Sequence, residues 1–110
     1  MKTATRAWVR KAEADFRGAS ALAASRPPLH DLVCFHCQQC AEKYLKGLME
    51  ELGSPIPKIH ELDPLLTMLL PHHASLRSLH RGLTFLSNFA VAARYPGYSA
   101  RKRQAAAALR

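Results

Sequence analysis

Residues 32–52, LVCFHCQQCAEKYLKGLMEEL, decide the fold of this chain. The stretch contains no proline, and its one glycine lies far inside it, so it predicts a single helix of about six turns. Apolar side chains share one broad side of this helix: Cys34, Cys37, Cys40, Ala41, Tyr44, Leu45, Leu48, Met49 and Leu52. Because burial of each leucine stabilises the fold by ~1.5–3 kcal/mol, we expect other helices to cover this side.

The opposite side of the same helix is polar. His36, Gln39, Lys43 and Lys46 fall within about 80° of one another at ~100° per residue. They predict a polar strip two to three turns long.

The flanking sequence predicts helices on both sides of residues 32–52. A first helix is expected from about Arg6 to Ala24, and Pro27 and Pro28 follow its end. Its apolar stripe, which we expect to face the core, consists of Trp8, Ala12, Phe16, Ala19 and Ala23. Asp31 is a candidate N-cap for the central helix, and Gly53 ends that helix.

The second half of the chain predicts shorter helices. We expect a third helix near Asp63–Leu70, a fourth over about Ala74–Ala92, and an Ala-rich fifth helix, capped by Ser99, that runs to Arg110. The fourth helix has Leu76, Leu79, Leu83, Leu86 and Ala90 as its apolar seam, with Phe85 and Phe89 on a shoulder beside it. No stretch alternates like a strand, so the prediction is an all-α antiparallel bundle forming one domain over residues 1–110.

Composition limits the class of protein. The chain has 110 residues, 48% of them apolar, and a net charge of +8. No apolar run is long enough to span a membrane, and the charged N-terminal stretch has no signal-peptide core, so we expect a soluble, cytoplasmic chain without membrane partners. The basic balance fits an anionic partner, but an ordinary solvated surface is the commoner explanation.

Cys34, Cys37 and Cys40, together with His36, raise the question of a metal site. On a helix, however, the first and third thiols diverge by about 120°, and the imidazole points to the opposite side. We therefore expect the cysteines to pack as small apolar residues, with no metal and no cofactor. His72, His73 and His80 are expected in solvated positions, because no carboxylate lies near them in sequence.

Three motifs occur in an order that resembles the HEPN domain family. The helix from Cys34 to Leu48 matches the family's F-x-x-Q-Q-x-x-E-K-x-L-K pattern, His60-Glu61-Leu62 matches its H-[DE]-L step, and Arg94-Tyr95-Pro96 follows the fourth helix. The resemblance covers residues 8–98. It implies a four- to five-helix up-and-down bundle, here with a last helix that is short or truncated.

The resemblance also implies a function. Such domains pair as dimers, are proposed to bind nucleotides, and often accompany a minimal nucleotidyltransferase in a toxin–antitoxin-like pair. We therefore expect a binding module rather than an enzyme, with no catalytic residue assigned, a homodimer, a nucleotidyltransferase partner and a nucleotide as ligand. RNA is the less favoured ligand, because the Arg-spacer-His motif of the ribonuclease members is absent: Arg94 is followed by Tyr-Pro-Gly-Tyr-Ser-Ala-Arg.

The predicted ligand-binding residues are His36, Gln39, Lys43, Lys46, Arg94 and Tyr95. Lysine and arginine offer charge to phosphate, glutamine offers a donor and an acceptor to a base edge, and tyrosine offers a ring for stacking. The competing interpretation is a solvated face on which Lys46 pairs with Glu50. Two further functions stay open: a ribonuclease toxin that uses His36 or His60, and a purely structural adaptor.

Overall fold

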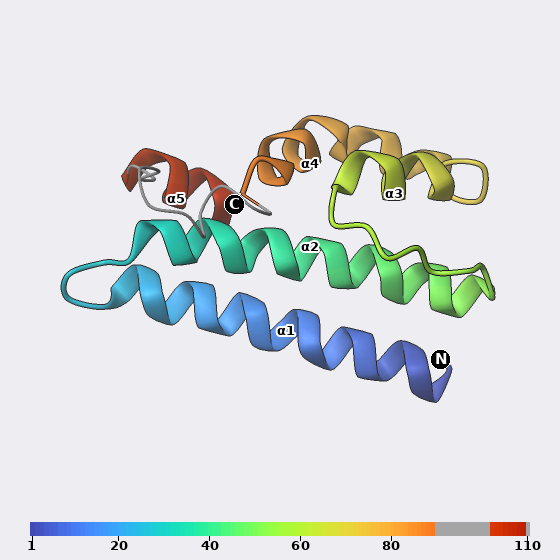
Figure 1. The fold of residues 1–110 in the computed structure, drawn as a ribbon, viewed down its shortest axis with the longest axis horizontal. Coiled ribbons are helices and arrows are strands. Elements are labelled where there is room, and N and C mark those ends of the chain that lie inside the picture. The colour runs from blue at the N-terminus through green and yellow to red at the C-terminus, as the bar shows by residue number, and fades with distance from the viewer. Residues whose placement is uncertain (90–101, 110) are drawn as a thin grey trace.

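A computed structural model describes residues 1–89 and 102–109 of the chain. Two long helices, α1 (Thr3–Ala24) and α2 (His30–Leu52), lie side by side and antiparallel (Figure 1). The shorter helices are α3 (Leu62–Leu69), a 3₁₀ helix η1 (Ala74–Leu79), α4 (His80–Ser87) and α5 (Lys102–Leu109). Among the described residues there is no strand, which confirms the all-α prediction.

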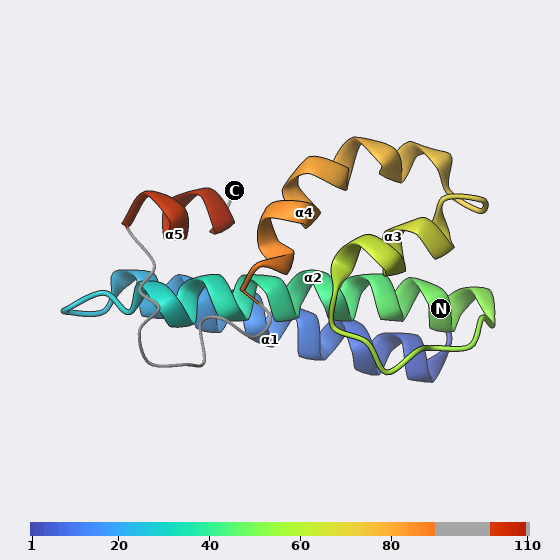
Figure 2. The same cartoon turned by 45° about the horizontal axis from the view of Figure 1, so that its top comes forward.

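The helices form two layers around α2. Figures 1 and 2 show α1 along one side of α2, while α3, α4 and α5 cover another side. The segment between Leu52 and Leu62 runs back along α2 before α3 begins (Figure 1). Because α2 contacts every other α-helix, it is the centre of the fold, as the sequence predicts.

The ends of α2 follow from local chemistry. Gly53 adopts a left-handed conformation with φ 74°, and its N–H donates to the carbonyl of Glu50, while the N–H of Ser54 reaches Met49. This arrangement satisfies carbonyls that the helix end would leave unpaired. The predicted N-cap is wrong, because the helix begins at His30 and Asp31 lies inside its first turn. A carboxylate there still interacts favourably with the helix dipole.

Small residues allow α1 and α2 to approach closely. Thr5, Ala12 and Ala19 are the buried residues of α1. On α2, a Cβ added at Gly47 would lie 3.1 Å from the Cβ of Trp8, closer than most side chains come. The long helices therefore meet through small side chains, and the larger side chains of α1 are displaced toward the edges of this contact.

The apolar core has two clusters on α2. One, beside α5 and the end of α4, contains Ala19, Val33, Cys34, Cys37, Phe89 and Ala105. The other, beside α3 and α4, contains Leu45, Met49, Leu62, Leu65, Leu66, Leu69 and Leu83. The leucines of α3 and the cysteines of α2 are thus core residues, as predicted.

The aromatic residues reverse their predicted positions. Phe16, expected in the core, is 45% exposed, as is Tyr44, and Phe89, expected on an exposed shoulder, is 1% exposed. Phe89 meets Phe85 edge to face, with ring centroids 5.3 Å apart. For Phe89 the reason is tertiary, because its ring packs in one apolar cluster with Ala105 of α5.

The predicted fourth helix is divided. Residues 74–79 form η1, and α4 ends at Ser87. The last part of the predicted helix, residues 90–92 with Ala90 of the seam, lies outside the described residues. Ser78 donates its hydroxyl to the carbonyl of Ser75, a local bond that competes with regular α-helix. No residue of η1 is buried, and Leu79 of the predicted seam is 47% exposed. The predicted Ser99 cap lies outside the described residues as well.

Candidate polar site beside helix α2

A carboxylate on α1 holds two of the predicted site residues. Asp15 accepts a bond from His36 Nδ1 through Oδ1 at 2.9 Å, and its Oδ2 accepts from Lys43 Nζ. His36 and Lys43 lie two turns apart on α2, on the side that faces α1. We call Asp15, His36 and Lys43 the Asp15 cluster. All three side chains are partly accessible to solvent.

A second carboxylate, on α2 itself, organises a more buried group. Glu42 accepts from Lys46 Nζ at 3.1 Å, and His60 Nδ1 lies 3.2 Å from Glu42 Oε1. Gln38 completes the group, because its Nε2 donates to the carbonyl of His60 at 2.7 Å and lies 3.4 Å from Glu42 Oε1. We call Gln38, Glu42, Lys46 and His60 the Glu42 cluster. It fastens the segment before α3 to the side of α2.

The two clusters are adjacent on α2. Gln39 lies between His36 and Lys43 on α2, and its Nε2 donates to Gln38 Oε1 at 2.7 Å. Gln39 therefore joins this part of α2 to the Glu42 cluster. Four of the six predicted site residues thus lie along one side of α2: His36, Gln39, Lys43 and Lys46. Arg94 and Tyr95 lie outside the described residues.

The structure also shows partners that the sequence analysis missed. Asp15, Gln38 and Glu42 are not among the predicted site residues, and the sequence names His60 only in the H-[DE]-L step and in the alternative ribonuclease function. Lys46 is 5% exposed and pairs with Glu42, not with Glu50 as the solvated-face interpretation supposed. Both glutamates are four residues from Lys46, so sequence spacing alone could not choose between them.

The three cysteines are buried and free. Burial raises the pKa of Cys34 and Cys40 to about 11, and burial together with the two neighbouring thiols raises that of Cys37 to about 12. Protonated thiols are poor nucleophiles and poor metal ligands. Within residues 1–89 and 102–109, no three His, Cys, Asp or Glu side chains are placed to hold a metal ion together.

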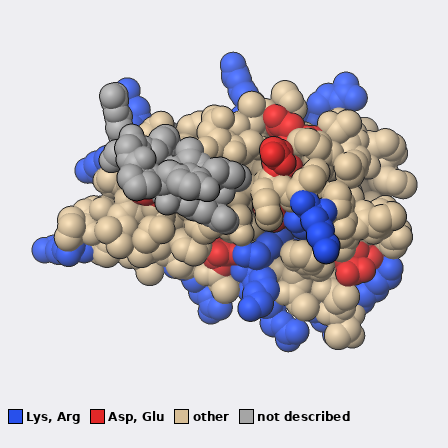
Figure 3. All heavy atoms as spheres, in the orientation of Figure 1, with Lys and Arg blue, Asp and Glu red and all other residues tan. Residues whose placement is uncertain are grey.

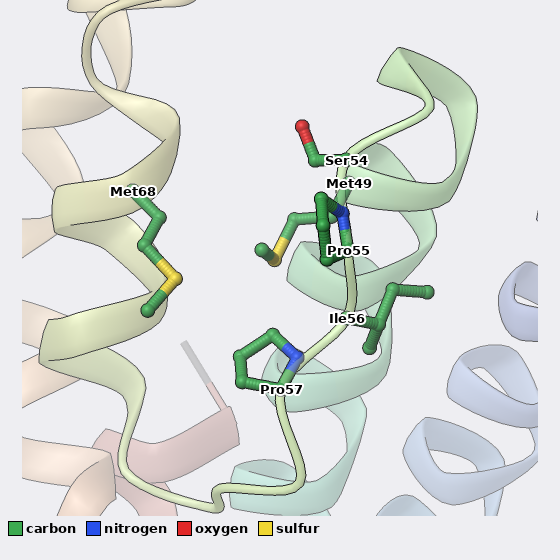
Figure 4. Close-up of a pocket in the computed structure, with 6 residues that line it drawn as sticks. All are labelled: Met49, Ser54, Pro55, Ile56, Pro57 and Met68. Carbon is green, nitrogen blue, oxygen red and sulfur yellow. The ribbon is translucent and has the colours of Figure 1, made fainter.

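Two hollows on the described surface are apolar. One of about 380 Å³ lies between α3 and the segment that follows α2, where Met68 faces Met49 and Pro57 (Figure 4). Another, of about 460 Å³, lies over α2 and is lined by Phe16, Cys37, Cys40, Ala41, Tyr44, Leu45, Leu79, Leu83, Leu86, Ala108 and Leu109. Both are lined almost entirely by apolar side chains.

Basic residues are spread over the surface. On the face shown in Figure 3, Lys and Arg gather in the lower half, over α1 and α2, with Asp and Glu among them. The acidic side chains interrupt the basic ones there, which agrees with the pairing in the Asp15 cluster.

The family model of the HEPN domain matches residues 5–110, almost the whole chain. The chain belongs to the HEPN domain family. No curated protein and no solved structure is similar enough to count as a match. The match confirms the family expected from the motifs, and the polar clusters show what those motifs do in this HEPN domain. Gln38, Glu42 and Lys43 of the signature helix, with His60 of the H-[DE]-L step, form the contacts just described. None of the described helices is long and apolar enough to cross a membrane.

Proposed function

We propose that this HEPN domain binds a nucleotide and acts with a minimal nucleotidyltransferase, in a toxin–antitoxin-like pair, rather than as an enzyme by itself. One observation carries the proposal: His36, Gln39 and Lys43 lie together, partly exposed, along one side of α2. They combine a cation, an imidazole and an amide within two turns of one helix.

These groups fit the parts of a nucleotide. Lys43 supplies a positive charge for phosphate, and the amide of Gln39 can both donate to and accept from a base edge. Lys46 supports the site indirectly. Its ammonium is buried against Glu42 and holds this side of α2 in place. Arg94 and Tyr95 complete the proposed site with a second phosphate contact and a ring for stacking.

A homodimer accompanies this proposal. Phe16, Tyr44 and Leu79 are exposed around the 460 Å³ apolar hollow, whose lining residues do not include Asp15, His36 or Lys43. Large exposed apolar patches are typical of protein interfaces. A second copy of the chain would cover this surface and leave the polar side free for ligand and partner.

A calorimetric titration with ATP tests the nucleotide site. If the site is real, Lys43→Ala and Arg94→Ala should each weaken binding by ~1.5–3 kcal/mol, because each removes a charged contact to phosphate. Lys102→Ala on α5 is the matched control, since it removes the same charge from an exposed position outside the site. Equal affinity in all variants, or no binding at millimolar ATP, would leave the structural-adaptor function in its place.

A ribonuclease function remains the second candidate because of one contact. His60 is 59% exposed, and its Nδ1 faces the Glu42 carboxylate, which orients the ring and directs Nε2 away from the carboxylate. A carboxylate-oriented imidazole is a general-base arrangement. We expect no cleavage of transfer RNA by the purified chain, and cleavage abolished by His60→Ala would favour the ribonuclease.

A further inference from the structure

The carboxylate of Asp15 accepts from two donors on the neighbouring helix. His36 Nδ1 approaches one carboxylate oxygen at 2.9 Å, and Lys43 Nζ approaches the other. Both donors belong to α2, whereas the carboxylate comes from α1. The anion and its receptor are therefore on different elements, and rotation of one short side chain can separate them.

The same donors are suited to a phosphate group. A phosphate, like a carboxylate, presents neighbouring oxygens that accept bonds from a cation and an N–H group at once. With Asp15 in place, however, the charge of Lys43 is already neutralised, so a nucleotide approaching the site meets little net attraction. Both donors of the phosphate site are in place, but the carboxylate of Asp15 already occupies them.

We propose that Asp15 is an internal stand-in for the ligand's phosphate. Its carboxylate accepts from His36 and Lys43 and must move away from both donors when a nucleotide binds. The inference rests on the proposed function and adds a competition that sets the affinity of the same site. The ligand class it names is a compound with an exposed phosphate or diphosphate group.

The two clusters differ in their suitability for such an exchange. Glu42 and Lys46 are almost fully buried, so separating them would leave charges without water. Asp15, His36 and Lys43 each keep some contact with solvent, which lowers that cost. A displaced Asp15 also has Lys11 four residues earlier on α1, exposed and within reach of an i,i+4 pair.

The test is titration of inorganic pyrophosphate and of ATP into the wild type, Asp15→Asn and Glu13→Gln. Asp15→Asn removes the competing charge, so we expect it to bind about tenfold more tightly than the wild type. Glu13→Gln is the matched control: it removes the same charge from α1, but Glu13 lines a surface hollow with Phe16, Arg17 and Tyr44. Its affinity should stay within about twofold of wild type. The double variant Asp15→Asn/Lys43→Ala should lose the gain.

The outcomes separate this inference from the proposed function. Wild-type binding with equal affinity in Asp15→Asn and Glu13→Gln would overturn the stand-in role and leave the nucleotide site intact. Binding by none of the proteins would overturn both. Tight binding by Asp15→Asn alone would support the stand-in role.

A measurement on the wild type protects the test if Asp15→Asn does not fold. The ring signals of His36, assigned with His36→Gln, should shift when pyrophosphate is added to the wild type, because the ring changes its anionic partner. Saturable binding of pyrophosphate with no change in those signals would overturn the inference.

Discussion

At the scale of single residues, the side chains that matter most are polar groups held inside the fold. Lys46 and Glu42 are both buried, although lysine and glutamate are seldom buried unless they are paired. Their pairing explains why a charged residue can occupy the side of α2 that the segment before α3 covers.

Removing one member of this pair should strongly destabilise the fold. We expect Glu42→Ala to lower the free energy of unfolding by about 3–5 kcal/mol, because the ammonium of Lys46 is left buried without its counter-charge. Glu50→Ala, on the same helix, should cost less than about 1 kcal/mol. Urea denaturation measures both. If Glu42→Ala/Lys46→Met does not recover part of the loss, the buried-charge explanation is wrong.

The buried thiols predict a loss of stability at alkaline pH. Their pKa values are about 11 to 12 in the folded chain, against an ordinary value of 9.0. Well below pH 9 the thiols are protonated in both states, so they add no pH dependence there. As the pH rises from 9 toward 11, thiols of the unfolded chain ionise first and favour unfolding.

Urea denaturation at pH 8 and pH 10 measures this effect. The free energy of unfolding should fall over this interval in the wild type. Replacing Cys37 by Ala should make the fall smaller, even if that variant is less stable at pH 8. An unchanged slope would show that the thiols do not carry the pH dependence.

At the scale of elements, α2 is set by its own sequence and its end is set by one glycine. Gly53 has φ 74°, where a side chain is strained, whereas Gly18 lies inside α1 with nothing within 4 Å of an added Cβ. The two positions therefore predict opposite responses to the same substitution.

Gly53→Ala should destabilise the protein by about 1 kcal/mol, because alanine is strained in the left-handed region. Gly18→Ala should stabilise it by about 0.5–1 kcal/mol, since alanine loses less conformational entropy in a helix. Thermal unfolding followed by circular dichroism compares the pair. A fall in melting temperature for Gly18→Ala would contradict the open surroundings of that position.

At the scale of the whole molecule, the described residues carry a polar group and an apolar hollow next to α2. The Asp15 cluster joins α1 to α2, whereas Phe16 and Tyr44 line the apolar hollow. In the proposed function, the polar group binds the ligand and the apolar hollow binds a second copy.

The proposed homodimer should depend on the apolar surface around the 460 Å³ hollow. We expect Tyr44→Glu to raise the dimer dissociation constant by about tenfold or more, because it puts a charge into a desolvated interface. Met68→Glu is the control, since Met68 is about as exposed as Tyr44 but lies on α3, outside the lining of this hollow. Light scattering at ~100 µM, a concentration that populates a modest interface, measures both. A monomeric wild type would contradict the homodimer.

The sequence by itself determined the family, the helical class and the central helix. These depend on local features: the apolar periodicity of residues 32–52, the glycine and prolines that follow, and the order of three short motifs. It also determined that His36, Gln39, Lys43 and Lys46 share one side of α2, because helix geometry alone places them there.

The tertiary structure decided which partner each of those side chains has and how deeply each is buried. Asp15 meets Lys43 from 28 residues away, and His60 meets Glu42 from 18 residues away, so no local pattern contains either contact. The exchange of Phe16 and Phe89 between surface and core has the same origin. Periodicity tells which side chains share a face, but burial depends on which element covers that face and how closely it can approach.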